Sequence, residues 1–145
     1  MSAPYVDTSL LVKLYTAEAN SAHAEALVRA LPPPLPLTVW QELELRTALR
    51  CRLFRQEIRP AELTAALAAF TGDIASGHWQ RPACDPADVH REAERLSAAH
   101  AGTLGCRTLD ILHVAAALVI GAKDFLTFDP RQGALARPAG LRVKS

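Results

Sequence analysis

Acidic side chains recur in this sequence at points where a strand is predicted to end or a helix to begin. Asp7 follows the short apolar run Tyr5–Val6 and precedes apolar residues at helical spacing. Asp129 follows a second apolar stretch, and Asp110 lies in the first turn predicted for a helix that opens near Cys106. In open α/β sheets ligands bind outside the carboxyl ends of the parallel strands, so these acids are candidates for a functional site.

A helix predicted to begin near Thr38 or Val39 adds one more acid, which is either Glu42 or Glu44. Residues two apart on a helix lie about 200° apart around its axis, so only one of this pair can face the site.

A cluster of carboxylates without His or Cys partners favours a hard divalent cation such as Mg²⁺ or Mn²⁺ over zinc. Crowded acids repel one another at neutral pH, and a bound cation compensates that repulsion. The chemistry that such a cluster supports is metal-assisted hydrolysis of a phosphodiester, in which the cation lowers the pKa of the attacking water and stabilises the leaving oxygen.

The bulk composition predicts one ordinary globular domain spanning residues 1–145. The chain has 145 residues, is 50% hydrophobic and carries a net charge of +1, so no excess of basic charge indicates a nucleic-acid binder. Its 3 Cys residues have no metal-ligand spacing, and we expect them to be reduced and mostly buried in a cytoplasmic protein. No apolar run is long enough to span a membrane, and no targeting segment opens the chain.

The elements that must position the acids alternate along the chain. Strands are predicted at residues 5–6, 35–37, 123–128 and 141–143, and residues 78–81 form either a short extended link or an edge strand. Helices are predicted after Thr8 and at residues 21–31, 38–53, 60–74, 86–100, 106–120 and from 130, with the fifth helix ending before Gly102. This alternation predicts an α/β fold with a central, mostly parallel sheet that is flanked by helices.

Four segments in this order resemble the PIN-domain ribonucleases, and within them the VapC-type toxins of toxin–antitoxin modules. They are VDTSLLVKLY at residues 6–15, ELRTAL at 44–49, RTLDILHVAAA at 107–117 and LTFD at 126–129. Each segment alone is a weak signal, but four in order are a strong one. The resemblance implies a single PIN-like domain, an endoribonuclease that depends on Mg²⁺ or Mn²⁺, a cognate VapB-type antitoxin and a homodimer.

Carried over by position, the resemblance identifies Asp7, Glu44, Asp110 and Asp129 as the acidic quartet that binds metal and performs catalysis. Glu44 is preferred to Glu42 because it keeps the spacing to Ala48–Leu49. The supporting positions implied by the resemblance are Ser9 and Thr127, whose hydroxyls would bond a carboxylate or a metal-bound water, and Arg107, which would contact substrate phosphate. Thr47 departs from the family, which often has Asn there.

Each feature also has a purely structural interpretation. Asp7, Asp110 and Asp129 could serve only as helix caps or as first-turn acids, and Glu42 is expected to be a solvated helix acid. His113 lies three residues after Asp110 on the same helix face and could reach the site, but a core or hydrogen-bonded histidine is expected. The arginines between residues 46 and 59 form either an RNA-contacting surface or a solvated helix face. The alternative function is a catalytically silent PIN-like module that binds RNA or protein; a nuclease acting on DNA ranks lower.

Overall fold

The structure is a computed structural model that describes residues 2–145, and it has the predicted α/β character. Contacts divide the chain into two compact units. We call residues 2–7 and 82–145 the three-strand unit, and residues 8–81 the two-strand unit. The single domain and the PIN-like family stay predictions.

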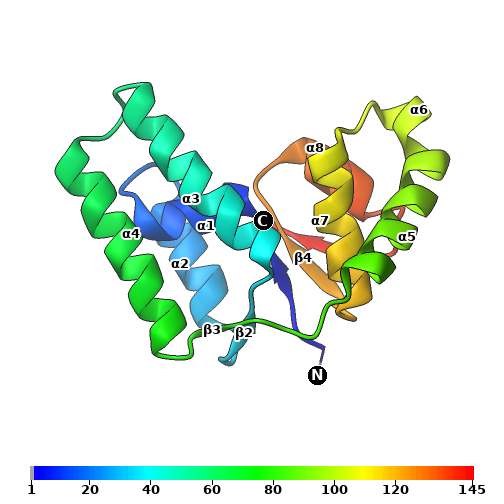
Figure 1. Cartoon of the computed structure of the whole chain (residues 1–145), viewed down its shortest axis with the longest axis horizontal. Helices are drawn as coiled ribbons and strands as arrows, with labels where there is room; N and C mark the ends of the chain where they lie inside the picture. The colour runs from blue at the N-terminus through cyan, green and yellow to red at the C-terminus, as the bar shows by residue number, and fades with distance from the viewer. Residues whose placement is uncertain (1) are drawn as a thin grey trace. The chain divides into compact units, whose positions relative to one another are not determined.

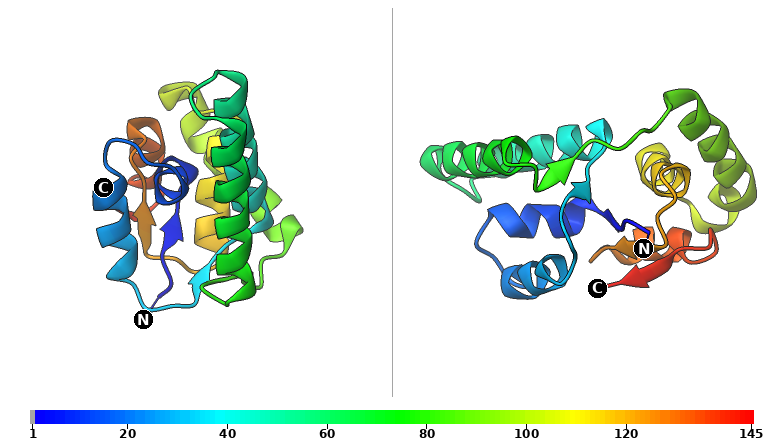
Figure 2. Two further views of the ribbon diagram at one scale, coloured as in Figure 1. Left: turned by 90° about the vertical axis from the view of Figure 1, so that its left-hand side faces the viewer. Right: turned by 90° about the horizontal axis from the view of Figure 1, so that it is seen from below.

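The sheet of the three-strand unit is short and entirely parallel. β1 (Tyr5–Val6), β4 (Asp124–Leu126) and β5 (Arg142–Lys144) pair in the order β1-β4-β5. Val6 is in register with Leu126, and the arrows of β1 and β4 run side by side in the same direction (Figure 2). The carboxyl ends of the three strands therefore meet at one edge of the sheet.

The helices of this unit supply its core. α7 (Thr108–Val119) buries most of its apolar run, and α5 (Pro86–Leu96) packs along it (Figure 1). α8 (Pro130–Ala136) contacts both α7 and β5. Asp85 and Pro86 start α5 as predicted, because the Asp85 carboxylate accepts a hydrogen bond from the Ala87 N–H at 2.8 Å.

The predicted end of the fifth helix is wrong. α5 continues through a π-helical turn, η1 (Ser97–Ala101), into α6 (Gly102–Leu104), so Gly102 lies inside the helical run with a φ of −68°. The run ends at Gly105, whose φ of +65° is the left-handed conformation that glycine adopts without steric cost.

The two-strand unit is mainly helical. α1 (Thr8–Tyr15), α2 (Ser21–Arg29), α3 (Val39–Phe54) and α4 (Pro60–Ala75) accompany a parallel pair of strands, β2 (Leu35–Pro36) and β3 (Trp79–Gln80). The five strands thus form two separate sheets instead of the one central sheet predicted. α3 and α4 pack side by side (Figure 1).

Side-chain hydrogen bonds fix the local geometry of this unit. Thr38 and Gln41 form a capping box at the start of α3, as a helix beginning at Val39 requires. The Trp79 indole N–H donates to the Tyr15 hydroxyl at 2.8 Å, and that hydroxyl donates to Asp73 at 2.6 Å. This chain of bonds ties β3 to α1 and α4.

Two further predictions concern the cysteines and the membrane. All three cysteines are free thiols, but Cys51 is exposed and Cys84 and Cys106 are half-buried, so the expectation that they are mostly buried is wrong. Within residues 2–145, no helix combines the length and apolar character needed to cross a membrane.

Candidate functional site

Asp7 and Asp129 are connected through one hydroxyl at the carboxyl edge of the three-strand sheet. Asp7 directly follows β1 and is 3% exposed, and its N–H donates to the Leu126 carbonyl at 2.8 Å. The Thr127 hydroxyl, just after β4, donates to Asp7 Oδ2 at 2.8 Å and accepts the Asp129 N–H at 3.0 Å. The parallel pairing of β1 with β4 therefore brings together three residues that the sequence singled out.

Asp129 is also the N-cap of α8. Its Oδ1 accepts the Arg131 N–H at 2.9 Å, while its Oδ2 has no hydrogen-bond partner among the residues described. The predicted capping role is confirmed, and one carboxylate oxygen remains available for a ligand.

Asp110 lies in the first turn of α7, where its Oδ2 accepts the Arg107 N–H at 3.4 Å. Asp110 and Arg107 line a pocket of about 410 Å³ together with Pro130 and Arg131, at the start of α8. The third acid of the predicted quartet thus shares a pocket with the start of the element that Asp129 caps. We name this cavity the α7–α8 pocket.

The predicted role of Glu42 as a solvated helix acid is wrong. Its side chain is 6% exposed and accepts two hydrogen bonds from Arg81, at 2.7 and 3.3 Å, and one from Arg46 at 3.2 Å. The Arg81 guanidinium lowers the pKa of Glu42, and Arg46 adds to this effect, although burial acts in the opposite direction. Glu42 is therefore an ion-paired structural residue of the two-strand unit.

Glu44 and Ser9 also belong to the two-strand unit. Glu44 is half-buried on α3, and Ser9 is half-buried in the first turn of α1. Their membership of the acidic site stays a prediction.

The chemistry of the donor set fits Mg²⁺ or Mn²⁺ held by few protein ligands. Within residues 2–145, no three His, Cys, Asp or Glu side chains gather as a metal-binding group. Mg²⁺ does not require such a cage, because it usually keeps several waters and takes one or two carboxylates together with substrate phosphates. Asp7 and Asp129, joined by Thr127, provide two carboxylates of this kind.

His113 is a buried residue of α7. It is 1% exposed, and the Tyr5 hydroxyl lies 2.6 Å from its Nδ1. Tyr5 in turn stacks on Phe125 in the neighbouring strand. The prediction of a hydrogen-bonded core histidine is confirmed.

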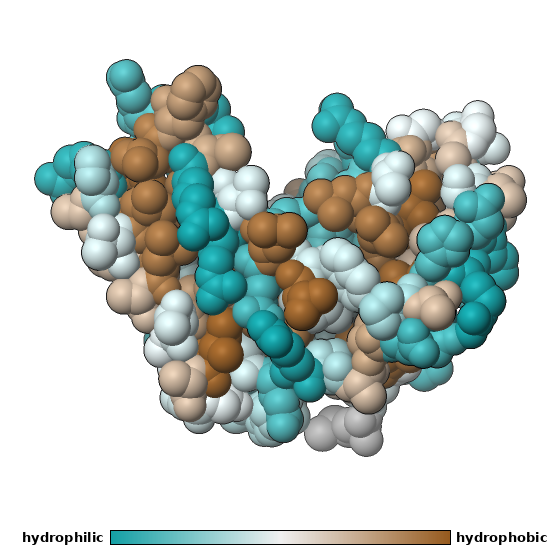
Figure 3. Space-filling view, in the orientation of Figure 1, coloured by the Kyte–Doolittle hydropathy of each residue, from teal (hydrophilic) through white to brown (hydrophobic). Residues whose placement is uncertain are grey.

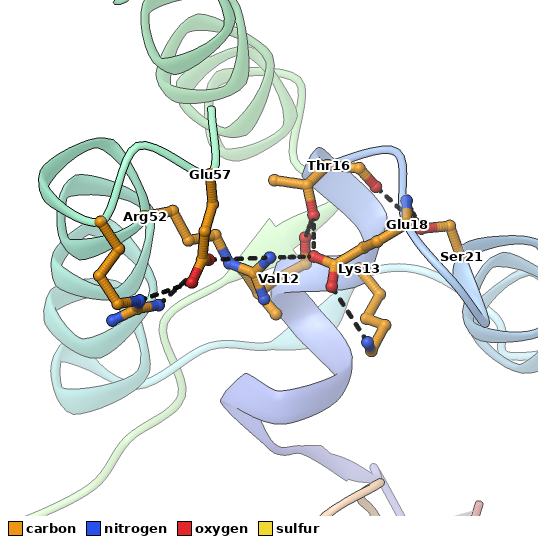
Figure 4. A network of polar contacts seen from close by, with 8 residues as sticks. Val12, Lys13, Thr16, Glu18, Ser21, Arg52 and Glu57 are labelled. Carbon is orange, nitrogen blue, oxygen red and sulfur yellow. Dashed lines mark hydrogen bonds and ion pairs between the residues drawn. The ribbon is translucent and has the colours of Figure 1, made fainter. Parts of the chain in front are cut away.

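Most of the arginines between residues 46 and 59 are engaged by carboxylates. Arg52 bridges Glu18 and Glu57 (Figure 4). Arg55 also binds Glu57. Burial opposes ionisation of Glu18, but hydrogen bonds from Thr16 and Lys13 and the charge of Arg52 outweigh it and lower the pKa. The remaining pairs of this series are Arg46 with Glu42 and Arg59 with Glu62.

Sequence reasoning missed two cations beside Asp129. Arg131 lines the α7–α8 pocket, and Arg137 lines a second pocket, of about 240 Å³, together with Thr127 and Asp129. The sequence held a local signal for Arg131, because Arg131 follows Asp129 by two residues and Asp129 was both a predicted helix cap and a candidate metal ligand. Arg137 lies one residue beyond the C-terminal end of α8, and no motif marks it.

No protein-family model matches the chain, and a search of curated proteins finds no match for it.

Proposed function

We propose that this protein is a PIN-like, metal-dependent endoribonuclease of the VapC toxin type, which hydrolyses RNA phosphodiester bonds. The observation that carries the proposal is the pair of acids, Asp7 and Asp129, at the carboxyl ends of neighbouring parallel strands with the Thr127 hydroxyl between them. The order of the four motif-like segments supports the choice of RNA as substrate.

The residues have distinct roles in this proposal. Asp7 and Asp129 would hold Mg²⁺ or Mn²⁺, and Asp110 would complete the site directly or through water. Glu44 would hold or activate the attacking water, a role that rests on the resemblance alone. The cation would supply Lewis-acid stabilisation of phosphate charge and a water of lowered pKa.

Thr127 positions the two acids without taking part in proton transfer. Its single proton is donated to Asp7, and its oxygen accepts the Asp129 N–H, so the hydroxyl links the side chain of Asp7 to the backbone of Asp129. The buried Asp7 carboxylate keeps its orientation because Thr127 and the β1–β4 pairing both restrain it.

The proposed partners are RNA, a VapB-type antitoxin and a second copy of the chain, in the cytoplasm. Exposed apolar side chains on α3, which are Val39, Leu43 and Phe54, support a protein-binding surface there. The α3–α4 pair displays apolar side chains beside long hydrophilic ones on the face drawn in Figure 3.

RNA cleavage with added Mg²⁺ or Mn²⁺ tests the proposal. Asp7→Asn, Asp110→Asn and Asp129→Asn should each remove the activity while circular dichroism remains that of the wild type. Asp129→Asn is informative because Asn is also a good N-cap, so the change removes charge and keeps the cap. Asp85→Asn is the matched control, since Asp85 caps α5 in the same way and lies outside the proposed site.

Full cleavage by Asp7→Asn or Asp129→Asn would refute the proposed site. Metal-independent RNA binding without cleavage by the wild type would instead support the alternative, a catalytically silent binding module. Comparing Glu44→Gln with Glu42→Gln separates the remaining ambiguity: the first should lose cleavage with unchanged stability, and the second should lose stability.

A further inference from the structure

We propose that three arginines around α8 bind the RNA phosphates on either side of the scissile one, with Arg107 and Arg131 holding one neighbouring phosphate and Arg137 another. This inference rests on the proposed function. It assigns the path that the RNA takes along the three-strand unit.

The first observation is that, among the described residues, only a few Lys and Arg side chains lack a salt bridge to a carboxylate. Most of the 16 Lys and Arg side chains form a salt bridge with a carboxylate. In the part of the chain that the structure describes, those that form none are Arg50, Arg107, Lys123, Arg131 and Arg137. Three of these five surround the short helix α8, and all three are exposed.

The second observation is that the three arginines line two cavities, one of which includes Asp110 and the other Asp129. Arg107 and Arg131 line the α7–α8 pocket. Arg137 lines the pocket of about 240 Å³ that also includes Thr127 and Asp129. Pro130 borders both cavities, so a strand that occupied both would pass directly over the Asp129–Pro130 step.

The geometry of α8 accounts for this arrangement. Arg131 and Arg137 are six residues apart, which places them about 240° apart around a helix axis, and so on different sides of α8. Gly133 leaves space for the Arg137 side chain, because a Cβ at that position would approach Arg137 Nη1 to 3.3 Å and Val143 to 3.5 Å.

Electrostatics explain why such cations are needed. A group of carboxylates repels a polyanion, and a bound divalent cation offsets only part of that repulsion. Arginine binds phosphate through a planar fork of donors, and an arginine without a carboxylate partner does not have to break an ion pair first. Asp110 is the acid that lines the α7–α8 pocket with Arg107 and Arg131, and it accepts only the Arg107 backbone N–H among the contacts described.

Binding of a labelled single-stranded RNA to the Asp7→Asn protein in Mg²⁺ tests the inference without cleavage. Arg107→Gln, Arg131→Gln and Arg137→Gln should each raise Kd and reduce the slope of log Kd against log salt by about 0.7 to 1. Lys123→Gln is the control, because it removes an equally exposed, unpaired cation just before β4, at the amino end of the same strand. Equal losses in all four variants, or no loss in the three arginine variants, would overturn the inference.

Oligonucleotides with one uncharged methylphosphonate assign the phosphates. If each arginine binds the phosphate proposed for it, replacing that phosphate removes the difference between wild type and the corresponding variant. The effects of Arg131→Gln and Arg137→Gln on Kd should disappear with methylphosphonates on opposite sides of the cleaved bond. A shared sensitive position would contradict the two-sided path.

Failure of the inference is distinguishable from failure of the proposed function. Metal-dependent cleavage that is lost in Asp7→Asn but unaffected by the arginine variants would refute the phosphate path alone. RNA binding that depends on the three arginines, without cleavage by the wild type, would refute the nuclease and leave the arginine–phosphate contacts around α8 intact.

Discussion

The Thr127 hydroxyl decides how Asp7 and Asp129 are held relative to each other. Asp7 is buried at the end of β1, and Asp129 is half-buried beyond the end of β4, so no backbone pairing joins the two directly. One O–H can donate to only one acceptor while its oxygen accepts another hydrogen, and Thr127 uses both capacities. Removing this hydroxyl would leave a buried carboxylate and a backbone N–H each short of one bond.

We expect Thr127→Val to destabilise the protein by about 1–3 kcal/mol, because the change keeps the side-chain shape and leaves buried polar groups unsatisfied. RNA cleavage should fall by more than the loss of folded protein explains. Thr127→Ser, which keeps the hydroxyl, should retain most of the stability and activity. Urea unfolding and cleavage rates on the same samples measure both; equal behaviour of Val and Ser would contradict the positioning role.

Glu42 should contribute to stability in a pH-dependent way. Its ion pairs lower its folded-state pKa below that of the unfolded chain, so its contribution is complete above about pH 4.5 and is lost as pH falls through the lowered value. Glu42→Gln should therefore cost about 1–2 kcal/mol at pH 7, and its difference from wild type should shrink below pH 4. Urea unfolding at the two pH values checks this. Glu94→Gln is the control, because Glu94 is exposed and forms no ion pair within the described residues; a loss equal to that of Glu42→Gln would contradict the prediction.

At this scale, local sequence patterns predicted the positions of Asp7, Asp110 and Asp129 but not the partner of Glu42. Each of the three lies where a strand ends or a helix begins, and such positions can be read from neighbouring residues. Arg81 is 39 residues from Glu42, and only the packing of the link after β3 against α3 brings it there. The residues next to Glu42 in the sequence do not show whether its side chain is solvated or is buried and ion-paired.

At the scale of elements, the helical run from α5 to α6 shows why glycine marks helix ends unreliably. Gly102 and Gly105 both follow apolar periodicity, and either could end the run. Only the backbone distinguishes them: Gly102 has helical φ, whereas Gly105 has positive φ. The π-helical turn η1 precedes α6 without ending the run. The helix starts at Thr38, Asp85 and Asp129 were predictable because a capping side chain bonds within its own turn.

The two glycines should respond oppositely to alanine. Gly105→Ala places a Cβ on a left-handed residue and should destabilise the protein by about 1 kcal/mol, although the surrounding space is open. Gly102→Ala should be neutral or stabilising by up to about 1 kcal/mol, because alanine favours the helix and nothing lies within 4 Å of the new Cβ. Thermal unfolding of both variants measures the difference. A larger loss at Gly102 than at Gly105 would place the helix end where the sequence predicted it.

At the scale of the whole molecule, the charge balance explains where a polyanion can bind. Lys and Arg total 16 and Asp and Glu total 15, so the chain offers no general attraction to RNA. This balance is read directly from the composition. The sequence also marked the arginines of residues 46–59 as a candidate RNA-contacting surface. Three of the ion pairs that engage these arginines are local in the sequence: Arg46 with Glu42, Arg55 with Glu57 and Arg59 with Glu62. The pair of Arg52 with Glu18 joins distant segments, so it depends on tertiary packing.

RNA affinity should consequently depend only moderately on ionic strength. Each phosphate neutralised on a single strand contributes about −0.7 to the slope of log K against log salt, so three arginines predict a slope of about −2. If the five arginines of residues 46–59 formed the binding surface instead, the slope would be about −3.5. Titrations of the Asp7→Asn protein at several salt concentrations distinguish the two values.

Arg55→Gln should leave the slope unchanged, because Glu57 already engages Arg55, whereas Arg131→Gln should make it shallower. A slope near −3.5 that became shallower only in Arg55→Gln would move the RNA-binding surface from α8 to the arginines of the two-strand unit.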